Sequence, residues 1–256
     1  MSAAAVELHG LTKRFGGVEA VRDVSLSVPE GRIRGIIGPN GAGKTTLLNM
    51  MSALQRPTSG TIRFFGEDVD GWPVHRVATR ARVVRTFQTV RLFASMTVHG
   101  NVVVAAGARA PRDGELLLGE HDLTAMSPSE RADAVLDVLE ITDLRDREVT
   151  ELSYGTRRKV ELARALVLHP RLLLLDEPAA GLNGAERHEL AELLGLLRER
   201  GLTVVLVEHQ MDLVSAICDE LTVLDFGEVI CEGDPGSVIE DERVLEAYLG
   251  AVGGRL

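Results

Sequence analysis

A glycine-rich stretch between an apolar run and a run of helix-forming residues constrains the fold more than any other part of the sequence. It reads GPNGAGKTT from Gly38 to Thr46 and follows the apolar segment 33–37. Glycines allow successive backbone N–H groups to converge on an anion without side-chain clashes. The helix expected over 45–54 points its positive end toward the same place. The order strand, loop, helix therefore predicts a phosphate-binding loop.

The spacing Gly-x-x-x-x-Gly-Lys-Thr within this stretch predicts a site for a nucleoside triphosphate. The side chain of Lys44 is expected to reach the β- and γ-phosphates, and the hydroxyl of Thr45 to ligate Mg²⁺. A plain glycine turn is disfavoured by the flanking strand and helix, and a dinucleotide site by its different glycine spacing. The predicted nucleotide-binding residues are Gly38, Pro39, Asn40, Gly41, Ala42, Gly43, Lys44, Thr45 and Thr46.

Two acids follow a second apolar segment, at 172–175. Ligands of parallel-sheet proteins bind at the carboxyl ends of the strands, so both acids are expected at the same edge of the sheet as the glycine loop. We expect Asp176 to belong to the Mg²⁺ shell and Glu177 to act as general base on the attacking water. The alternative is an acidic turn after a strand, and the phosphate-binding loop upstream disfavours it.

A histidine follows the third apolar strand, which is expected at 203–207. At a strand end, the imidazole of His209 can contact a γ-phosphate and orient the attacking water. By sequence spacing alone, a partly buried structural histidine is an equally good interpretation.

The periodicity of the remaining chain predicts an α/β fold. Strands that alternate with helices indicate a mostly parallel sheet covered by helices on both faces. Strands are expected at 6–8, 24–28, 33–37, 61–65, 172–175 and 203–207. Helices are expected at 45–54, 130–139, 157–168 and 186–200, with one or two short helices over 238–249 and a loose loop at 105–111.

Composition excludes several classes of function. The formal net charge is -10 and nothing in the sequence suggests the basic face that a nucleic-acid binder usually carries, so no nucleic-acid partner is expected. Cys218 and Cys231 lack the spacing of a metal site and fit a reducing compartment. The sequence has no apolar run of about 18 residues and no signal-peptide pattern, so we expect any membrane role to come through a partner.

In this order, the features resemble the ATP-binding subunits of ABC transporters, and the resemblance runs through nearly the whole chain. It implies that Phe15 stacks on the adenine of ATP and that Gln88 contacts Mg²⁺ and signals to a membrane subunit. It also implies that His209 is the switch histidine of the family. The implied catalytic residues are Glu177, His209 and Gln88, and the implied metal ligands are Thr45, Gln88 and Asp176.

The resemblance also implies a site that is shared between two chains. Ser153, Tyr154 and Gly155 fall at the signature motif of the family, which closes over the nucleotide of a partner subunit. Two subunits would thus enclose two ATP molecules head to tail. Tyr154 and Thr156 depart from the usual Leu-Ser-Gly-Gly-Gln pattern, and Asn183 of the D-loop stands where many relatives have aspartate.

The implied fold class is α/β, a P-loop NTPase of the ABC ATPase type. It combines a RecA-like parallel-sheet core with an N-terminal antiparallel β subdomain and a helical signature subdomain. We expect a single ATP-binding domain over 1–250, with the helical subdomain at about 89–165 and a tail at 251–256.

Within the family, the sequence is most similar to the ATPase of branched-chain amino-acid (Liv-type) importers, through segments 85–93, 178–183, 207–213 and 246–250. This implies uptake of a small solute, with branched-chain or hydrophobic amino acids as the leading cargo. The implied partners are a second ATP-binding subunit (identical or paralogous), two transmembrane permease subunits and an external solute-binding protein. The implied location is the cytoplasmic face of the plasma membrane, where the chain would be peripheral.

Several alternatives remain open at this point. The cargo could instead be urea or a short amide, and the chain could be an ABC ATPase without a transport role. A kinase with a P-loop is disfavoured by the signature segment, and a non-catalytic nucleotide-binding regulator is disfavoured by Glu177 and His209.

Overall fold

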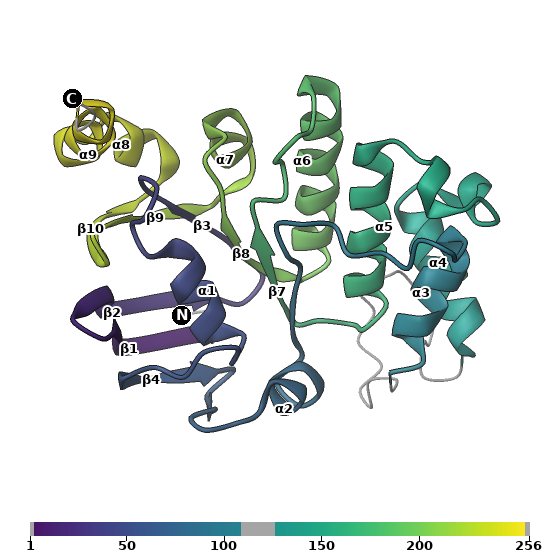
Figure 1. Cartoon of the computed structure of the whole chain (residues 1–256), viewed down its shortest axis with the longest axis horizontal. Helices are drawn as coiled ribbons and strands as arrows, with labels where there is room; N and C mark the ends of the chain where they lie inside the picture. The colour runs from purple at the N-terminus through teal and green to yellow at the C-terminus, as the bar shows by residue number, and fades with distance from the viewer. Residues whose placement is uncertain (1–2, 109–125, 254–256) are drawn as a thin grey trace.

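The structure is a computed structural model that describes residues 3–108 and 126–253. Two sheets and a set of helices make up this part of the chain (Figure 1). The strands are β1 Ala4–Phe15, β2 Val18–Pro29, β3 Ile33–Ile37, β4 Ser59–Phe64, β5 Glu67–Asp68, β6 Val83–Arg85, β7 Leu172–Asp176, β8 Thr203–Val207, β9 Glu220–Asp225 and β10 Glu228–Gly233.

Helices alternate with the strands over most of the sequence, as expected for an α/β fold. Two short 3₁₀ helices cover Thr142–Leu144 and Val149–Glu151. The α-helices are α1 Lys44–Met51, α2 Val74–Thr79, α3 Val98–Ala106, α4 Pro128–Val138, α5 Tyr154–Leu166, α6 Gly184–Glu199, α7 Met211–Ile217, α8 Pro235–Glu240 and α9 Glu242–Gly253.

The larger sheet has six strands in the order β10-β9-β3-β8-β7-β6. All its neighbours pair in parallel except β9 and β10, which confirms the predicted mostly parallel sheet. The register pairs Asp176 at the end of β7 with Val207 at the end of β8. The carboxyl ends of β3, β7 and β8 therefore lie at one edge, where the glycine loop, the acid pair and His209 follow them.

The two faces of this sheet belong to different cores, and β7 shows the division most clearly. Leu172 and Leu174 pack with α1 and with the small antiparallel sheet, whose strand order is β2-β1-β4-β5. Leu173 and Leu175 pack in the other core, with residues of α4, α5 and α6. Since strand side chains alternate between faces, a continuous leucine run fills both cores at once.

The helical layer lies at one end of the molecule. In Figure 1, α3 and α4 stand beyond α5, on the opposite side of β7 from the antiparallel sheet. Within the described residues, no helix is long and apolar enough to span a bilayer.

Helix boundaries depart from the predictions at the capping residues. Helix α1 ends at Met51 and not at residue 54, because Ser52 caps it and Ala53 takes a left-handed φ of 57°. Helix α5 starts at Tyr154 and not at residue 157, because the Ser153 hydroxyl accepts a hydrogen bond from the Thr156 amide at 3.1 Å. Helix α6 starts at Gly184, behind a capping box.

Other parts of the pattern escaped prediction. The prediction did not include the pair β9 and β10, the short strands β5 and β6 or the helices α2, α3 and α7 as separate elements. The expected loose loop is wrong at its start, because residues 105 and 106 are the last residues of α3, and its residues 109–111 lie outside the described residues. The prediction of one or two helices over 238–249 is confirmed by α8 and α9.

Candidate nucleotide site

The glycine loop requires glycine at two positions for different contacts. Gly38 has a φ of 144°, and a Cβ there would lie 2.0 Å from the Leu224 carbonyl oxygen. Gly43 has a φ of 100°, and a Cβ there would lie 2.3 Å from the Ala20 carbonyl oxygen. Both positions combine a left-handed backbone with close approach to another main chain. The loop is thus held as a compact cradle of backbone groups between β3 and α1.

Lys44 is the first residue of α1 and its side chain folds over the loop. Its Nζ donates hydrogen bonds to the carbonyl oxygens of Gly38, at 2.7 Å, and Pro39, at 2.8 Å. Burial lowers the pKa of Lys44, and the nearby carboxylates of Glu177 and Asp176 oppose that shift. Among the described residues, no side chain caps the first turn of α1, so its N–H groups are available to an anion.

Asp176 ends β7 in a buried ion pair that the sequence analysis did not anticipate. Its Oδ2 accepts a hydrogen bond at 2.8 Å from Nη2 of Arg85, the last residue of the neighbouring strand β6. Arg85 also donates from Nη1 to Oδ1 of Asn49 on α1, at 2.6 Å. The pair fixes the carboxylate against β6 and α1, since a buried charge is retained only where it is partnered.

Glu177 and Gln88 meet directly. Nε2 of Gln88 donates to Oε2 of Glu177 at 2.7 Å. The backbone of Glu177 takes a left-handed φ of 47°, and its N–H donates to the Val207 carbonyl at 2.9 Å. A left-handed backbone is unusual for a residue other than glycine, and it persists only where the surroundings hold it. Here it turns the acid out of the strand toward Gln88.

Glu208 is a second residue that the sequence analysis missed. Its side chain is fully buried, and its Oε1 accepts a hydrogen bond from the Ala179 amide at 2.8 Å. Its Oε2 accepts from the amides of His209, at 2.7 Å, and Gln210, at 3.1 Å. The signal that could have identified Glu208 is its position directly after the buried strand β8. The carboxylate ties the turn that carries His209 to the turn that follows Glu177.

A large open cleft lies beside these groups, and Gln88, Glu177 and His209 line it, whereas Lys44, Thr45 and Asp176 are not among its lining residues. Its volume is about 1520 Å³, and it lies between the glycine loop, the ends of β7 and β8 and the C-terminal helix α9. Tyr248 of α9 lines it, and its hydroxyl accepts a hydrogen bond from the Gly38 amide at 2.9 Å. The lining consists of Gly38, Pro39, Asn40, Gly41, Ala42, Gln88, Glu177, His209, Asp225, Phe226, Ile230, Arg243, Glu246, Ala247 and Tyr248.

The predicted signature and D-loop residues gather elsewhere. Ser153 caps α5, and Asn183 caps α6 by accepting from the Glu186 amide at 3.0 Å. A Cβ on Gly155 would lie 2.2 Å from Oε1 of Glu186, and one on Gly181 would lie 3.1 Å from the Tyr154 ring. The two helix starts therefore touch each other. Among the described residues, none of this group lines the cleft at the glycine loop.

Phe15 stands apart from both groups. It ends β1, its side chain is 46% exposed, and Nζ of Lys13 lies 5.1 Å from the centre of its ring. An exposed aromatic face at this position is free to stack, but it is not part of the cleft lining.

Comparison with known proteins identifies the class. The family model described as "ABC transporter" matches residues 21–180, and the chain belongs to this family of ATP-binding cassettes, whose members hydrolyse ATP. The predicted fold class and ATPase activity are thereby confirmed. A second model, described as "Branched-chain amino acid ATP-binding cassette transporter", matches residues 228–253, which include β10, α8 and α9.

Individual relatives are similar to the chain over nearly its whole length. The chain is 42% identical to the high-affinity branched-chain amino acid transport ATP-binding protein BraF of Pseudomonas aeruginosa, over 98% of this chain and 99% of BraF. It is 39% identical to the corresponding protein LivG of Escherichia coli, with the same coverage. These matches favour a transporter ATPase over a kinase or a non-catalytic regulator.

Solved structures show the same architecture. An ABC-transporter ATP-binding cassette in its ADP conformation superimposes with a TM-score of 0.86, at 30% identity over 96% of this chain and 99% of that one. A dimeric cassette bound to ADP and Pi superimposes with a TM-score of 0.76, at 27% identity over 90% of this chain and 98% of that one.

Proposed function

We propose that the chain is the ATP-hydrolysing subunit of an importer for branched-chain or other hydrophobic amino acids. The observation that carries the hydrolytic part is the convergence of the glycine loop, Gln88, Glu177 and His209 on one cleft. The identity of 42% to BraF over nearly the full chain supports the cargo class. Urea or a short amide is the alternative cargo.

The chemistry of the loop fits a nucleotide. The backbone cradle has no room for a Cβ at Gly38 or Gly43, and the N–H groups at the start of α1 are available to phosphate oxygens. We propose that all residues from Gly38 to Thr46 bind the nucleotide and that Phe15 stacks on its adenine. Lys44 would exchange its two carbonyl partners for phosphate oxygens, a stronger pairing because the acceptor carries charge.

The donor set also fits Mg²⁺, which prefers oxygen ligands. We propose that it is held by the hydroxyl of Thr45, the amide oxygen of Gln88 and the carboxylate of Asp176. Because Arg85 binds Oδ2 of Asp176, the other carboxylate oxygen is the one left to face the ion or its water. When bound, Mg²⁺ neutralises charge on the phosphates and on the leaving group.

Hydrolysis is assigned to three residues. Glu177 would accept the proton of the attacking water as general base, and its hydrogen bond with Gln88 holds the carboxylate at the cleft. His209, fixed through Glu208, would orient the water and contact the γ-phosphate. Each of the three lines the cleft beside the glycine loop.

We propose that the chain works in a head-to-tail pair, identical or paralogous. Ser153, Tyr154 and Gly155 lie at the N-terminal end of α5, outside the cleft of their own chain, and would bind the nucleotide of the partner. Asn183 at the start of α6 would lie beside them at the shared interface. The dimeric relative with bound ADP and Pi supports this arrangement.

The relatives are transport ATP-binding proteins, which supports a wider assembly. We propose two permease subunits, an external solute-binding protein and a peripheral position on the cytoplasmic face of the plasma membrane. The net charge of -10 supports the absence of a nucleic-acid partner. We retain the proposal of one domain over 1–250, with a helical subdomain at about 89–165 and a tail at 251–256.

We propose that the permease docks near residues 88–101. Phe93 is 44% exposed there, and Leu92 packs at the edge of the helical core. Charged substitutions at both Leu92 and Phe93 should leave ATP hydrolysis by the isolated subunit intact and abolish assembly with the permease in a pull-down. Undiminished assembly would place the docking surface elsewhere.

Uptake in a deletion strain tests the cargo. Loss of the gene should abolish high-affinity uptake of radiolabelled leucine, and the wild-type gene should restore it whereas the Glu177→Gln gene should not. Uptake of urea and of a short amide in the same strains serves as the control. Normal leucine uptake together with lost urea uptake would reassign the cargo without affecting the ATPase.

A further inference from the structure

Arg158 lies in α5, five residues after the cap Ser153, and its side chain is almost fully buried. Its Nη1 donates to the Phe87 carbonyl and to Oε2 of Glu161, both at 2.9 Å. Its Nη2 donates to the Gln88 carbonyl and, at 3.4 Å, to the Glu177 carbonyl. One guanidinium therefore holds the backbone of two residues that we assign to hydrolysis.

The same guanidinium also reaches the signature segment. Its Cζ lies 5.7 Å from the centre of the Tyr154 ring, one turn earlier on α5, which is within the range of a cation–π contact. Tyr154 in turn faces Gly181 of the D-loop. A continuous set of contacts thus runs from the signature segment through Arg158 to Gln88 and Glu177.

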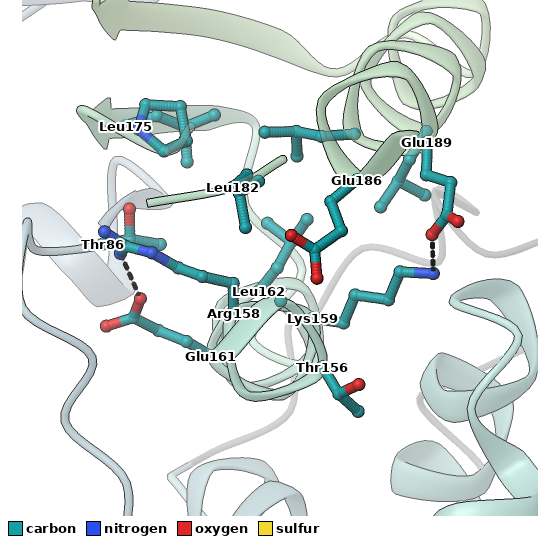
Figure 2. Close-up of a pocket in the computed structure, with 14 residues that line it drawn as sticks. Thr86, Thr156, Arg158, Lys159, Glu161, Leu162, Leu175, Leu182, Glu186 and Glu189 are labelled. Carbon is teal, nitrogen blue, oxygen red and sulfur yellow. Dashed lines mark hydrogen bonds and ion pairs between the residues drawn. The ribbon is translucent and has the colours of Figure 1, made fainter. Parts of the chain in front are cut away.

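A cavity lies beside Arg158, next to the point where Gly155 of α5 meets Glu186 of α6. It has a volume of about 220 Å³ and lies between the two helices and the end of β7 (Figure 2). Lys159 spans it with an ion pair to Glu189 of α6, whose Nζ–Oε2 distance is 2.7 Å. Two charged side chains of α5 thus make contacts at this cavity, and Arg158 is the one whose hydrogen bonds end on the backbone of the proposed hydrolytic residues.

Arg158 is a strong link for a physical reason. Hydrogen bonds from a charged donor are stronger than neutral ones, and a planar guanidinium can serve several acceptors in fixed directions. Glu161 completes the pair, and burial raises the pKa of that carboxyl while Arg158 opposes the shift.

We infer that Arg158 is a positioning residue that transmits closure of the signature segment on one nucleotide to Gln88 and Glu177 at the other. This inference rests on the proposed head-to-tail pair. When the partner's nucleotide draws the start of α5 inward, the guanidinium moves with the helix. Because the guanidinium is hydrogen-bonded to the carbonyls of Gln88 and Glu177, its movement reorients the loop of Gln88 and the turn of Glu177. Hydrolysis at the two sites thereby becomes coupled.

The test compares Arg158→Lys with the wild-type chain in the assembly that hydrolyses ATP. Lysine keeps the charge beside Glu161 but cannot reach the separate carbonyls together. We expect the Hill coefficient for ATP hydrolysis to fall to about one and kcat to fall about tenfold, the effect of losing hydrogen bonds from one charged group. The affinity of the isolated chain for ATP should stay unchanged, because Arg158 makes no contact with the glycine loop.

The matched control is Lys159→Gln, which removes the neighbouring cation on α5 and its link to α6 but no link to Gln88 or Glu177. We expect it to keep the wild-type Hill coefficient. An equal fall of the Hill coefficient in Lys159→Gln would show that general loosening of α5 causes the effect, and it would overturn the inference. A wild-type Hill coefficient in Arg158→Lys, or a non-cooperative wild-type assembly, would overturn it as well.

Hydrogen exchange of the isolated chain with a non-hydrolysable ATP analogue gives a readout that does not need the pair. Amides at 86–89 and 177–179 should exchange about tenfold faster in Arg158→Lys than in Lys159→Gln, since the lost bonds hold these segments. Arg158→Gln is the second variant if the lysine variant does not fold, with the same expectation. Unchanged exchange would refute the role of Arg158 in holding these two segments. Failure of the wild-type chain to pair would refute both the dimer proposal and the transmission between sites, and faster exchange in Arg158→Lys would then still show that Arg158 holds the two segments within one chain.

Discussion

The cleft at the glycine loop and the paired starts of α5 and α6 contain the motifs of one family, but they are built differently. Behind the cleft, buried carboxylates are held by partners, as Asp176 is by Arg85 and Glu208 is by backbone amides. At the helix starts, Ser153 and Asn183 are exposed and satisfy their own helices. The first region gathers around the cleft of its own chain, whereas no residue named in the second region lines that cleft. The difference supports the proposal that each chain contributes residues to two shared sites.

The largest expected effect separates hydrolysis from binding within the cleft. Glu177→Gln keeps the shape of the side chain and removes the general base, so kcat should fall by a factor of about 10³. A phosphate-release assay measures the loss, and equilibrium binding of a fluorescent ATP analogue should show unchanged affinity. Hydrolysis at the wild-type rate would remove Glu177 from the mechanism.

The second-largest expected effect concerns the positive charge of Lys44 at the glycine loop. Lys44→Ala should weaken ATP binding about 100-fold, since hydrogen bonds to a charged group are lost. Titration calorimetry of the isolated chain would measure it, with circular dichroism to show that the fold is intact. Unaltered affinity would contradict the role assigned to the ammonium group.

A smaller effect concerns the C-terminal helix as a wall of the cleft. Tyr248→Phe removes the oxygen that accepts from the Gly38 amide and should weaken nucleotide binding about fivefold, the value of one hydrogen bond. Leu249→Ala, at a 70% exposed position next in the helix, is the matched control and should bind normally. If both variants bind the nucleotide with equal affinity, the hydroxyl of Tyr248 has no role in nucleotide binding and the side chain serves only in packing.

The smallest expected effect tests whether the start of α5 takes part in nucleotide binding by its own chain. Ser153→Ala should lower the free energy of unfolding by about 1 kcal/mol through loss of the cap of α5. The affinity of the isolated chain for ATP should not change, because Ser153 lies outside the cleft of its own chain. Denaturant titration measures the first quantity. Weaker binding by the isolated variant would show that the signature serves the nucleotide of the same chain.

Local patterns predicted the elements that hold the site because their signals are short-range. The bounds of β3 and β8 agree with the prediction, since both strands are fully buried. Asp176 and Glu177 were expected after a strand at 172–175, and the structure places Asp176 as the last residue of β7 and Glu177 directly after it. Helix starts were set by caps, which periodicity does not detect. Strands β9 and β10 pair with each other, and the prediction missed them because β10 is mixed in polarity and β9 joins the large sheet through β3, which is distant in the sequence.

The sequence by itself determined the chemistry of the site, because a glycine cradle, a lysine and acids at strand ends are specified by residue type and short spacing. Only the tertiary structure decided which groups hold one another: Arg85 with Asp176, Gln88 with Glu177, Tyr248 with Gly38 and Arg158 with the backbone of both Gln88 and Glu177. These pairs join residues far apart in the chain. Their contacts depend on strand order and helix packing, which bring distant segments within hydrogen-bond distance and which no local pattern encodes.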